Sequence, residues 1–173
     1  EWWRCCGVPT ECEGSENSDT IRCRAGVVEL LDQRELPGEE RYLALREVED
    51  LAVAIEELAI RGAPAIGCAA AMGVALGAWH SAASDVAGLV EDLDSRVLPR
   101  LERTRPTAVN LFWALKRMQR RADRDLAAGA DGEGIVAGLV EEAKVIRDED
   151  DTTCQALGEV GAELIPDGAT VLT

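Results

Sequence analysis

Residues 65–80 of the chain have the sequence AIGCAAAMGVALGAWH. Glycines at positions 67, 73 and 77 are spaced among alanines and aliphatic residues, and the segment contains no Asp, Glu, Lys or Arg. Each glycine lowers helix propensity by about 1 kcal/mol, but it also lets a neighbouring backbone approach closely. The segment therefore predicts a buried central helix that other helices pack against.

The residues before this helix predict a hairpin and an amphipathic helix. Two short runs with alternating character surround Ala25-Gly26 within residues 20–36, which is typical of a β-hairpin ahead of the Pro37-Gly38 turn. Apolar residues then recur at helical spacing between acidic ones, and Gly62 and Pro64 end the pattern. The apolar positions of this helix are Val48, Leu51, Ala52, Ile55, Leu58 and Ala59.

Four further helices are predicted after the central one. Ser84 can cap a helix whose last turn Pro99 disturbs, and Thr107 can cap a helix over residues 107–127. Residues 129–134 then form a loop, and residues 135–147 and 148–165 form two more helices, the second opening on an acidic run at its N-terminus. The residues expected to face the core are Val109, Phe112, Trp113, Met118, Ile135, Leu139, Ala143 and Ile146.

The ends of the chain differ from this helical middle. Residues 1–19 lack periodicity and end in a Gly/Ser/Asn/Asp-rich run, so we interpret them as a disordered appendage. A turn at residues 166–168 precedes a β-branched run at 169–173, which predicts the first strand of a second, α/β domain. The predicted organisation is an appendage (1–19), a mainly α domain with an N-terminal β-hairpin (20–165), and the start of a truncated domain (166–173). The absence of Met at position 1 agrees with a fragment.

Composition excludes several classes of function. A formal charge of −15 opposes binding to nucleic acid, which depends on neutralising phosphates with Lys and Arg. The six cysteines form no CxxC pair and His80 is the only histidine, so we expect no metal. Residues 65–79 are too short and too rich in glycine to span a bilayer, and no signal peptide is recognisable. A cytoplasmic protein is therefore expected.

Two stretches place an arginine beside a predicted helix N-terminus. Arg61 precedes Gly62, Ala63 and Pro64, and Arg105 precedes a Pro-Thr-Ala run. Free N–H groups at a helix start and an Arg side chain together suit an anion. Two such places in one acidic domain favour a small phosphate-bearing ligand, although an arginine beside a helix end is, on this pattern alone, more often an ion-pair or capping residue.

Three motifs occur in the chain: LDQRELP at residues 31–37, AIRGAPAIG at residues 59–67 and RPTAVNLFW at residues 105–113. In this order and spacing they resemble the methylthioribose-1-phosphate isomerases. This family shares a superfamily with the regulatory subunits of translation initiation factor 2B and with ribose-1,5-bisphosphate isomerase. The resemblance covers residues 20–173.

The resemblance implies an enzyme of methionine salvage that converts 5-methylthioribose 1-phosphate to 5-methylthioribulose 1-phosphate without a cofactor. It places substrate contacts at Arg61, Gly62, Ala63 and Arg105, and it implies that the complete protein is a homodimer. The family's catalytic Cys and Asp belong to a Rossmann-like second domain and lie beyond Thr173, so the resemblance implies that residues 1–173 are inactive alone. Cys68 and Cys154 are expected to have packing roles instead.

Two alternatives remain open within the superfamily. A non-enzymatic regulatory subunit would not need Arg61 and Arg105 together, and a ribose-1,5-bisphosphate isomerase would act on a doubly phosphorylated sugar. The Asn-Leu-Phe-Trp continuation at residues 110–113 favours the methylthioribose branch.

Overall fold

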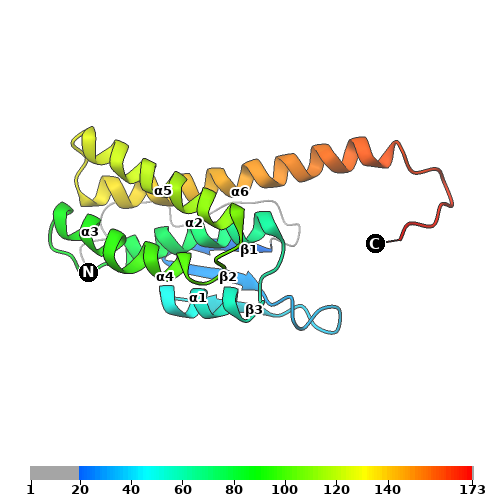
Figure 1. The fold of residues 1–173 in the computed structure, drawn as a ribbon, viewed down its shortest axis with the longest axis horizontal. Coiled ribbons are helices and arrows are strands. Elements are labelled where there is room, and N and C mark those ends of the chain that lie inside the picture. Colours follow the sequence, from blue (N-terminus) through cyan, green and yellow to red (C-terminus); the bar gives the residue numbers. More distant parts are fainter. Residues whose placement is uncertain (1–19, 173) are drawn as a thin grey trace.

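The computed structural model describes residues 20–172, which form a small antiparallel sheet and a set of helices packed around one central helix (Figure 1). The mainly α class with an N-terminal hairpin is confirmed. The elements are β1 (Ile21–Arg24), β2 (Val27–Leu31), β3 (Tyr42–Leu45), α1 (Val48–Glu56), α2 (Ala63–Trp79), α3 (Val86–Asp92), the π-helical turn η2 (Leu93–Val97), α4 (Leu98–Glu102), α5 (Val109–Ala127) and α6 (Gly132–Ala162).

The predicted hairpin is formed by β1 and β2, which pair from Ile21 with Leu30 to Arg24 with Val27. Ala25 and Gly26 have φ values of 46° and 72°, as a tight two-residue hairpin turn requires. A Cβ on Gly26 would lie 2.5 Å from Nε1 of Trp79, so this glycine also allows the turn to contact the end of α2. The sequence did not predict β3, a four-residue strand that extends the sheet beside β2.

Helix α2 is the predicted central helix, and every residue from 66 to 78 is buried. Its glycines face neighbouring helices at close range. A Cβ on Gly73 would lie 3.0 Å from side-chain atoms of Leu51 and Leu101, and one on Gly77 would lie 2.7 Å from Val97. As position 73 pairs with 101 and position 77 with 97, the η2–α4 segment runs antiparallel to α2.

The helix before Pro99 is interrupted, as expected for a residue without an N–H donor. It is divided into α3, η2 and α4, and the π-helical turn lies immediately before the proline-containing segment. The predicted cap is wrong by one residue, because the side chain of Asp85 rather than Ser84 accepts the N–H of Gly88 at 2.8 Å.

Helix α5 buries only part of the predicted face. Met118 is fully buried and Phe112 is partly buried against the core, but Val109 is 79% exposed and Trp113 is 50% exposed. The smaller Leu and Ala side chains form the buried stripe at helical spacing, and Trp113 lies at its border, where Arg117 stacks over its ring. The predicted cap at Thr107 is also absent, since Ala108 is the N-cap and makes no side-chain hydrogen bond. The buried residues of α5 are Leu111, Ala114, Leu115, Met118 and Ala122.

Helix α6 is one continuous helix of 31 residues where the sequence predicted two. It begins within the predicted loop, because Asp131 caps it by accepting the N–H of Gly134 at 2.8 Å. The acidic run at residues 148–151 therefore lies inside the helix and not at an N-terminus. Glu149 of this run pairs with Arg117 of α5, which stabilises the helix across the predicted break. The predicted core face is confirmed for Ile135, Leu139, Ala143 and Ile146.

The second half of α6 extends beyond the rest of the molecule (Figure 1). Almost every residue from 151 to 172 is exposed, including Leu157 at 68% and Val160 at 65%. Residues 169–172, where a strand was predicted, form none, because no other described strand lies beside them to pair with. The predicted appendage at residues 1–19 lies outside the described residues, and the domain division stays a prediction. No helix within residues 20–172 is long and apolar enough to cross a membrane.

Candidate functional site

The N-terminal ends of α2 and α5 lie side by side. Both helices begin at the same end of the molecule and run in the same direction (Figure 1). Their first turns are in contact, because a Cβ on Gly67 would lie 3.1 Å from the carbonyl oxygen of Asn110. The two arginine motifs, which are more than 40 residues apart in sequence, are thus brought to one corner of the fold.

Gly62 is the N-cap of α2 and has φ 101° and ψ 129°, a conformation that residues with a side chain rarely adopt. Its carbonyl oxygen accepts the N–H of Ile66 at 3.0 Å, which starts the helix. No side chain caps α2, and Pro64 has no N–H to satisfy. Within the described chain no acceptor is found for the N–H of Ala63, so this exposed helix start is open to an anion.

Arg61 lies on the exposed loop immediately before this helix start. Its backbone N–H donates to Oε1 of Gln33 at 3.1 Å, and its Nη2 donates to the backbone oxygen of Gln33 at 2.8 Å. Among residues 20–172 there is no acceptor for its Nε and Nη1. The guanidinium is therefore held through Nη2, and its other two nitrogens can donate to a ligand.

Arg105 lies before the N-terminus of α5 and is half-buried. Its carbonyl oxygen accepts the N–H of Ala108 at 2.9 Å, which fixes the entry to the helix. Its Nη1 is buried and has no hydrogen-bond partner in the part of the chain that the structure describes. A buried donor of this kind is costly unless a ligand satisfies it, and a phosphate oxygen is a fitting acceptor.

Cys68, the cysteine of α2, does not offer a nucleophile at this corner. Cys68 is 3% exposed in α2, and burial together with the carboxylates of Asp150 and Asp151 raises the pKa of its thiol to about 12. It packs in the core, as predicted. Cys154 lies on the exposed part of α6, so the predicted packing role is wrong for the described residues. No group of three or more potential metal ligands is present in residues 20–172.

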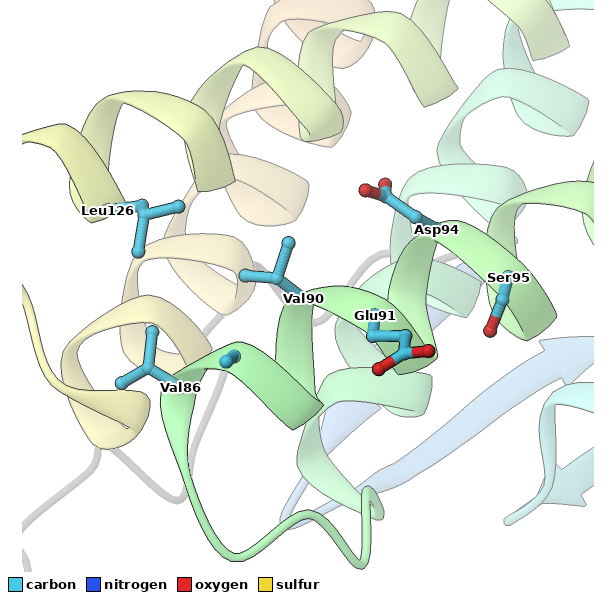
Figure 2. A pocket seen from close by; sticks show the side chains of 7 residues that line it. Val86, Val90, Glu91, Asp94, Ser95 and Leu126 are labelled. Carbon is cyan, nitrogen blue, oxygen red and sulfur yellow. The ribbon is translucent and has the colours of Figure 1, made fainter.

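A separate apolar groove lies at the opposite end of α2 and α5 (Figure 2). The side chains of Val86 and Val90 from α3 face Leu126 near the end of α5, and the carboxylates of Glu91 and Asp94 stand at its border. None of the arginines of the two motifs lines this groove, and its carboxylates would repel a phosphate. The groove is therefore no part of the candidate anion site.

The sequence assigned no role to the Asp32-Gln33-Arg34 part of the first motif. Asp32 is 1% exposed and accepts hydrogen bonds from Nε and Nη2 of Arg34 at 2.8 and 2.7 Å. These hydrogen bonds hold the pKa of the Asp32 carboxyl below its ordinary value, against the opposing effect of burial. The signal available in the sequence was a charged run directly after a hydrophobic strand.

Comparison with known proteins identifies the family. A model of the initiation factor 2 subunit family matches residues 59–173, which include both helix N-termini of the candidate site. The chain belongs to this family. Its resemblance to the methylthioribose-1-phosphate isomerases, which the three motifs indicated, is confirmed by the relatives described next.

Two curated relatives are close in sequence to this chain. A methylthioribose-1-phosphate isomerase of Geobacter metallireducens is 49% identical over 154 residues, covering 89% of this chain and 44% of the relative. A 5-deoxyribose 1-phosphate isomerase of Moorella thermoacetica is 47% identical over 154 residues, covering 88% and 43%. The chain thus spans less than half the length of the curated relatives it matches.

Two solved structures share the fold. The 5-methylthioribose 1-phosphate isomerase of Pyrococcus horikoshii gives a TM-score of 0.80 at 37% identity, covering 86% of this chain and 41% of the other. A translation initiation factor eIF-2B delta subunit from A. fulgidus gives a TM-score of 0.76 at 39% identity, covering 86% and 42%. The chain thus shares its fold both with a protein named as a sugar-phosphate isomerase and with a protein named as a translation initiation factor subunit.

Proposed function

We propose that this chain is part of an aldose–ketose isomerase that acts on 5-methylthioribose 1-phosphate. In this proposal Arg61, Gly62, Ala63 and Arg105 form the part of the substrate site that binds the sugar phosphate. The proposal is carried by two arginines that precede adjoining helix N-termini without side-chain caps, one of which, Arg105, has a buried Nη1 with no hydrogen-bond partner among the described residues. The names of the relatives in Geobacter and Pyrococcus support the same substrate.

The chemistry of the substrate explains why a phosphate site matters. The phosphate on C1 of the ribose prevents simple ring opening, so an acid must protonate the ring oxygen while hydrogen moves between C1 and C2. Fixing the phosphate orients C1 and C2 toward the acid and base groups. In the proposal this chain supplies that orientation, and the proton transfers belong to the Cys and Asp that the family resemblance places beyond Thr173.

The experiment is a titration of purified residues 1–173 with methylthioribose 1-phosphate, followed by nuclear magnetic resonance of backbone amides and arginine Nε–H groups. We expect binding in the millimolar range, about −4 kcal/mol, because only part of the site is present. The resonances of Arg61, Ala63 and Arg105 should shift, while those of the residues that line the apolar groove, such as Val86 and Leu126, should not.

Arg61→Ala and Arg105→Ala should each weaken binding about tenfold, which corresponds to about 1.4 kcal/mol. The matched control is Arg46→Ala, which removes the same charge from an exposed position between β3 and α1. Equal losses in all three variants would indicate a general charge effect and would contradict the proposed site.

The same measurement tests two alternatives, a different sugar phosphate and a chain that binds no sugar phosphate. The relative named 5-deoxyribose 1-phosphate isomerase favours a substrate that carries the same 1-phosphate and lacks the methylthio group. Equal affinity for the two sugar phosphates would mean that residues outside this site distinguish one substrate from the other. An absence of any sugar-phosphate binding would favour the regulatory-subunit alternative, which the similarity to the eIF-2B delta subunit keeps open.

We further propose that the complete protein is a cytoplasmic homodimer. The absence of a membrane-crossing helix in residues 20–172 is compatible with the location. The molecular mass of the complete protein in solution, measured by light scattering, checks the dimer.

A further inference from the structure

Gln33 makes three hydrogen bonds to the loop that carries Arg61. Its N–H donates to the carbonyl oxygen of Ala59 at 2.9 Å, its Oε1 accepts the N–H of Arg61 at 3.1 Å, and its own carbonyl oxygen accepts Nη2 of Arg61 at 2.8 Å. Both the backbone and the guanidinium of Arg61 are therefore fixed by one residue that lies 28 positions earlier in the chain.

The loop that carries Gln33 is itself anchored on both sides. Before Gln33, the N–H of Asp32 donates to the carbonyl oxygen of Arg41 at 2.8 Å. After Gln33, the side chain of Arg34 bridges Asp32 and Glu57, with both ion pairs at 2.7 Å. Glu57 is the C-cap of α1, so the loop is tied to the start of β3 and to the end of α1. Gln33 thus joins Arg61 to a rigid part of the fold.

We propose that Gln33 is a positioning residue for substrate binding, which acts by aiming the Arg61 guanidinium at the ligand's phosphate. With Nη2 held by the Gln33 carbonyl oxygen, Nε and Nη1 remain on opposite edges of the guanidinium, and each can donate separately to an acceptor such as a phosphate oxygen. A long flexible side chain that is held in its binding geometry before the ligand arrives loses less conformational freedom on binding. This inference rests on the proposed function, because it assigns Gln33 its role through Arg61.

A purely structural role for Gln33 would have different consequences. A change of the Gln33 side chain removes Oε1 directly, and it weakens the Nη2 hydrogen bond indirectly, because the Arg61 backbone that Oε1 holds is then free to move relative to the Gln33 carbonyl oxygen. Gln33→Met keeps the length of the side chain and removes that acceptor. If Gln33 merely stabilised the loop, the variant would melt at a lower temperature, and its folded fraction would bind methylthioribose 1-phosphate as before.

The decisive experiment is a double-mutant cycle on residues 1–173, with the affinity for methylthioribose 1-phosphate and the Nε–H resonance of Arg61 as readouts. We expect Gln33→Met to weaken binding three- to tenfold in the wild-type background and to have no further effect on Arg61→Ala. Without ligand, the Arg61 Nε–H resonance should broaden and exchange faster with water. The control is Gln119→Met on α5, whose amide makes only an exposed contact of 3.4 Å with Asp94.

The outcomes separate the two proposals. If Arg61→Ala itself leaves affinity unchanged, the proposed phosphate site is wrong. If Arg61→Ala weakens binding but Gln33→Met has no effect, or has the same effect in both backgrounds, the site stands and the role of Gln33 is overturned. Gln33→Asn keeps the amide but is one methylene too short to reach Arg61, so it should weaken binding as much as Gln33→Met does. It provides the comparison if Gln33→Met folds poorly.

Discussion

A Cβ atom on Gly67 would lie 3.1 Å from the carbonyl oxygen of Asn110, so the first turns of α2 and α5 meet backbone to backbone. This contact is closer than a residue with a side chain normally allows. It brings the helix start that follows Arg61 next to the one that follows Arg105. The geometry of the candidate site therefore depends on a glycine that has no contact with the ligand in our proposal.

Gly67→Ala should damage binding through this contact. The added methyl group meets a backbone atom that cannot rotate away, so α5 must shift relative to α2. Overpacking of about 1–3 kcal/mol is partly offset by the gain in helix propensity of about 1 kcal/mol, so we expect a net destabilisation of about 1 kcal/mol. Methylthioribose 1-phosphate should bind several-fold more weakly, as measured by the titration described above.

Gly77→Ala is the matched control for this prediction. Its Cβ would lie 2.7 Å from a side-chain atom of Val97, so it should also lower the free energy of unfolding. It lies near the other end of α2, however, and should leave affinity for the sugar phosphate unchanged. A loss of affinity that simply followed the loss of stability in both variants would contradict the role of the Gly67 contact.

Asp32→Asn should destabilise the protein in a pH-dependent manner. Hydrogen bonds from Arg34 lower the pKa of Asp32 in the folded state, so its carboxylate stabilises the fold above the unfolded pKa of about 3.9. That contribution is lost as the pH falls through the lower, folded pKa. Because Arg34 is 38% exposed and water partly replaces its contacts, we expect a difference of only about 1–2 kcal/mol at pH 7.

Urea unfolding of both proteins from pH 7 to pH 3 checks this prediction. The difference in free energy of unfolding should be full at pH 7 and shrink below about pH 4, as the wild-type carboxyl becomes protonated. A difference that stayed constant across this range would mean that Asp32 stabilises the fold through its shape and hydrogen bonds and not through its charge.

The parts of the fold that were predictable are those whose signals are local. The glycine-rich run at residues 65–80 specified α2, and Ala25-Gly26 specified the hairpin turn. The acidic run at residues 148–151 misled, because negative charge suits a helix N-terminus and the sequence does not reveal that Arg117 of another helix neutralises Glu149. The prediction that Trp113 faces the core was wrong, because its large hydrophobic side chain suggested burial while smaller Leu and Ala residues form the buried stripe of α5.

The candidate site shows the same division. The four proposed contact residues could be selected because each lies next to a helix-start signal. Gln33 could not be selected as the partner of Arg61, because a hydrogen bond between residues 28 positions apart depends on how β2 and the α1–α2 loop pack. The contact between Gly67 and Asn110 likewise becomes visible only once both helices are placed.

Cys68 and Cys154 should differ strongly in reactivity toward iodoacetamide at pH 7. The thiolate is the reactive form, and burial raises the pKa of Cys68 to about 12, so almost none is present. Cys154 is exposed on α6. Peptide mass spectrometry should find Cys154 alkylated within minutes and Cys68 alkylated only after unfolding. In denaturant the two should react alike, and comparable rates in the native protein would contradict the packing of α2.

The two halves of α6 should differ in amide hydrogen exchange. The helix is about 46 Å long at 1.5 Å per residue, but only its first half has a buried face, from Ile135 to Ile146. Helical hydrogen bonds without tertiary packing open at low cost, since most helix stability in proteins comes from the buried face. We expect amides of residues 152–162 to exchange at least 100-fold faster than those of residues 135–146, a difference of about 2.7 kcal/mol in opening free energy.

Exchange followed by mass spectrometry at two protein concentrations tests this expectation and controls for association. Rapid exchange in residues 152–162 at both concentrations supports an uncovered helix in residues 1–173. Protection that rises with concentration would show that another copy covers Leu157 and Val160. Strong protection at both concentrations would contradict the exposed position of this half of α6, because a helix without packing has no other source of such stability.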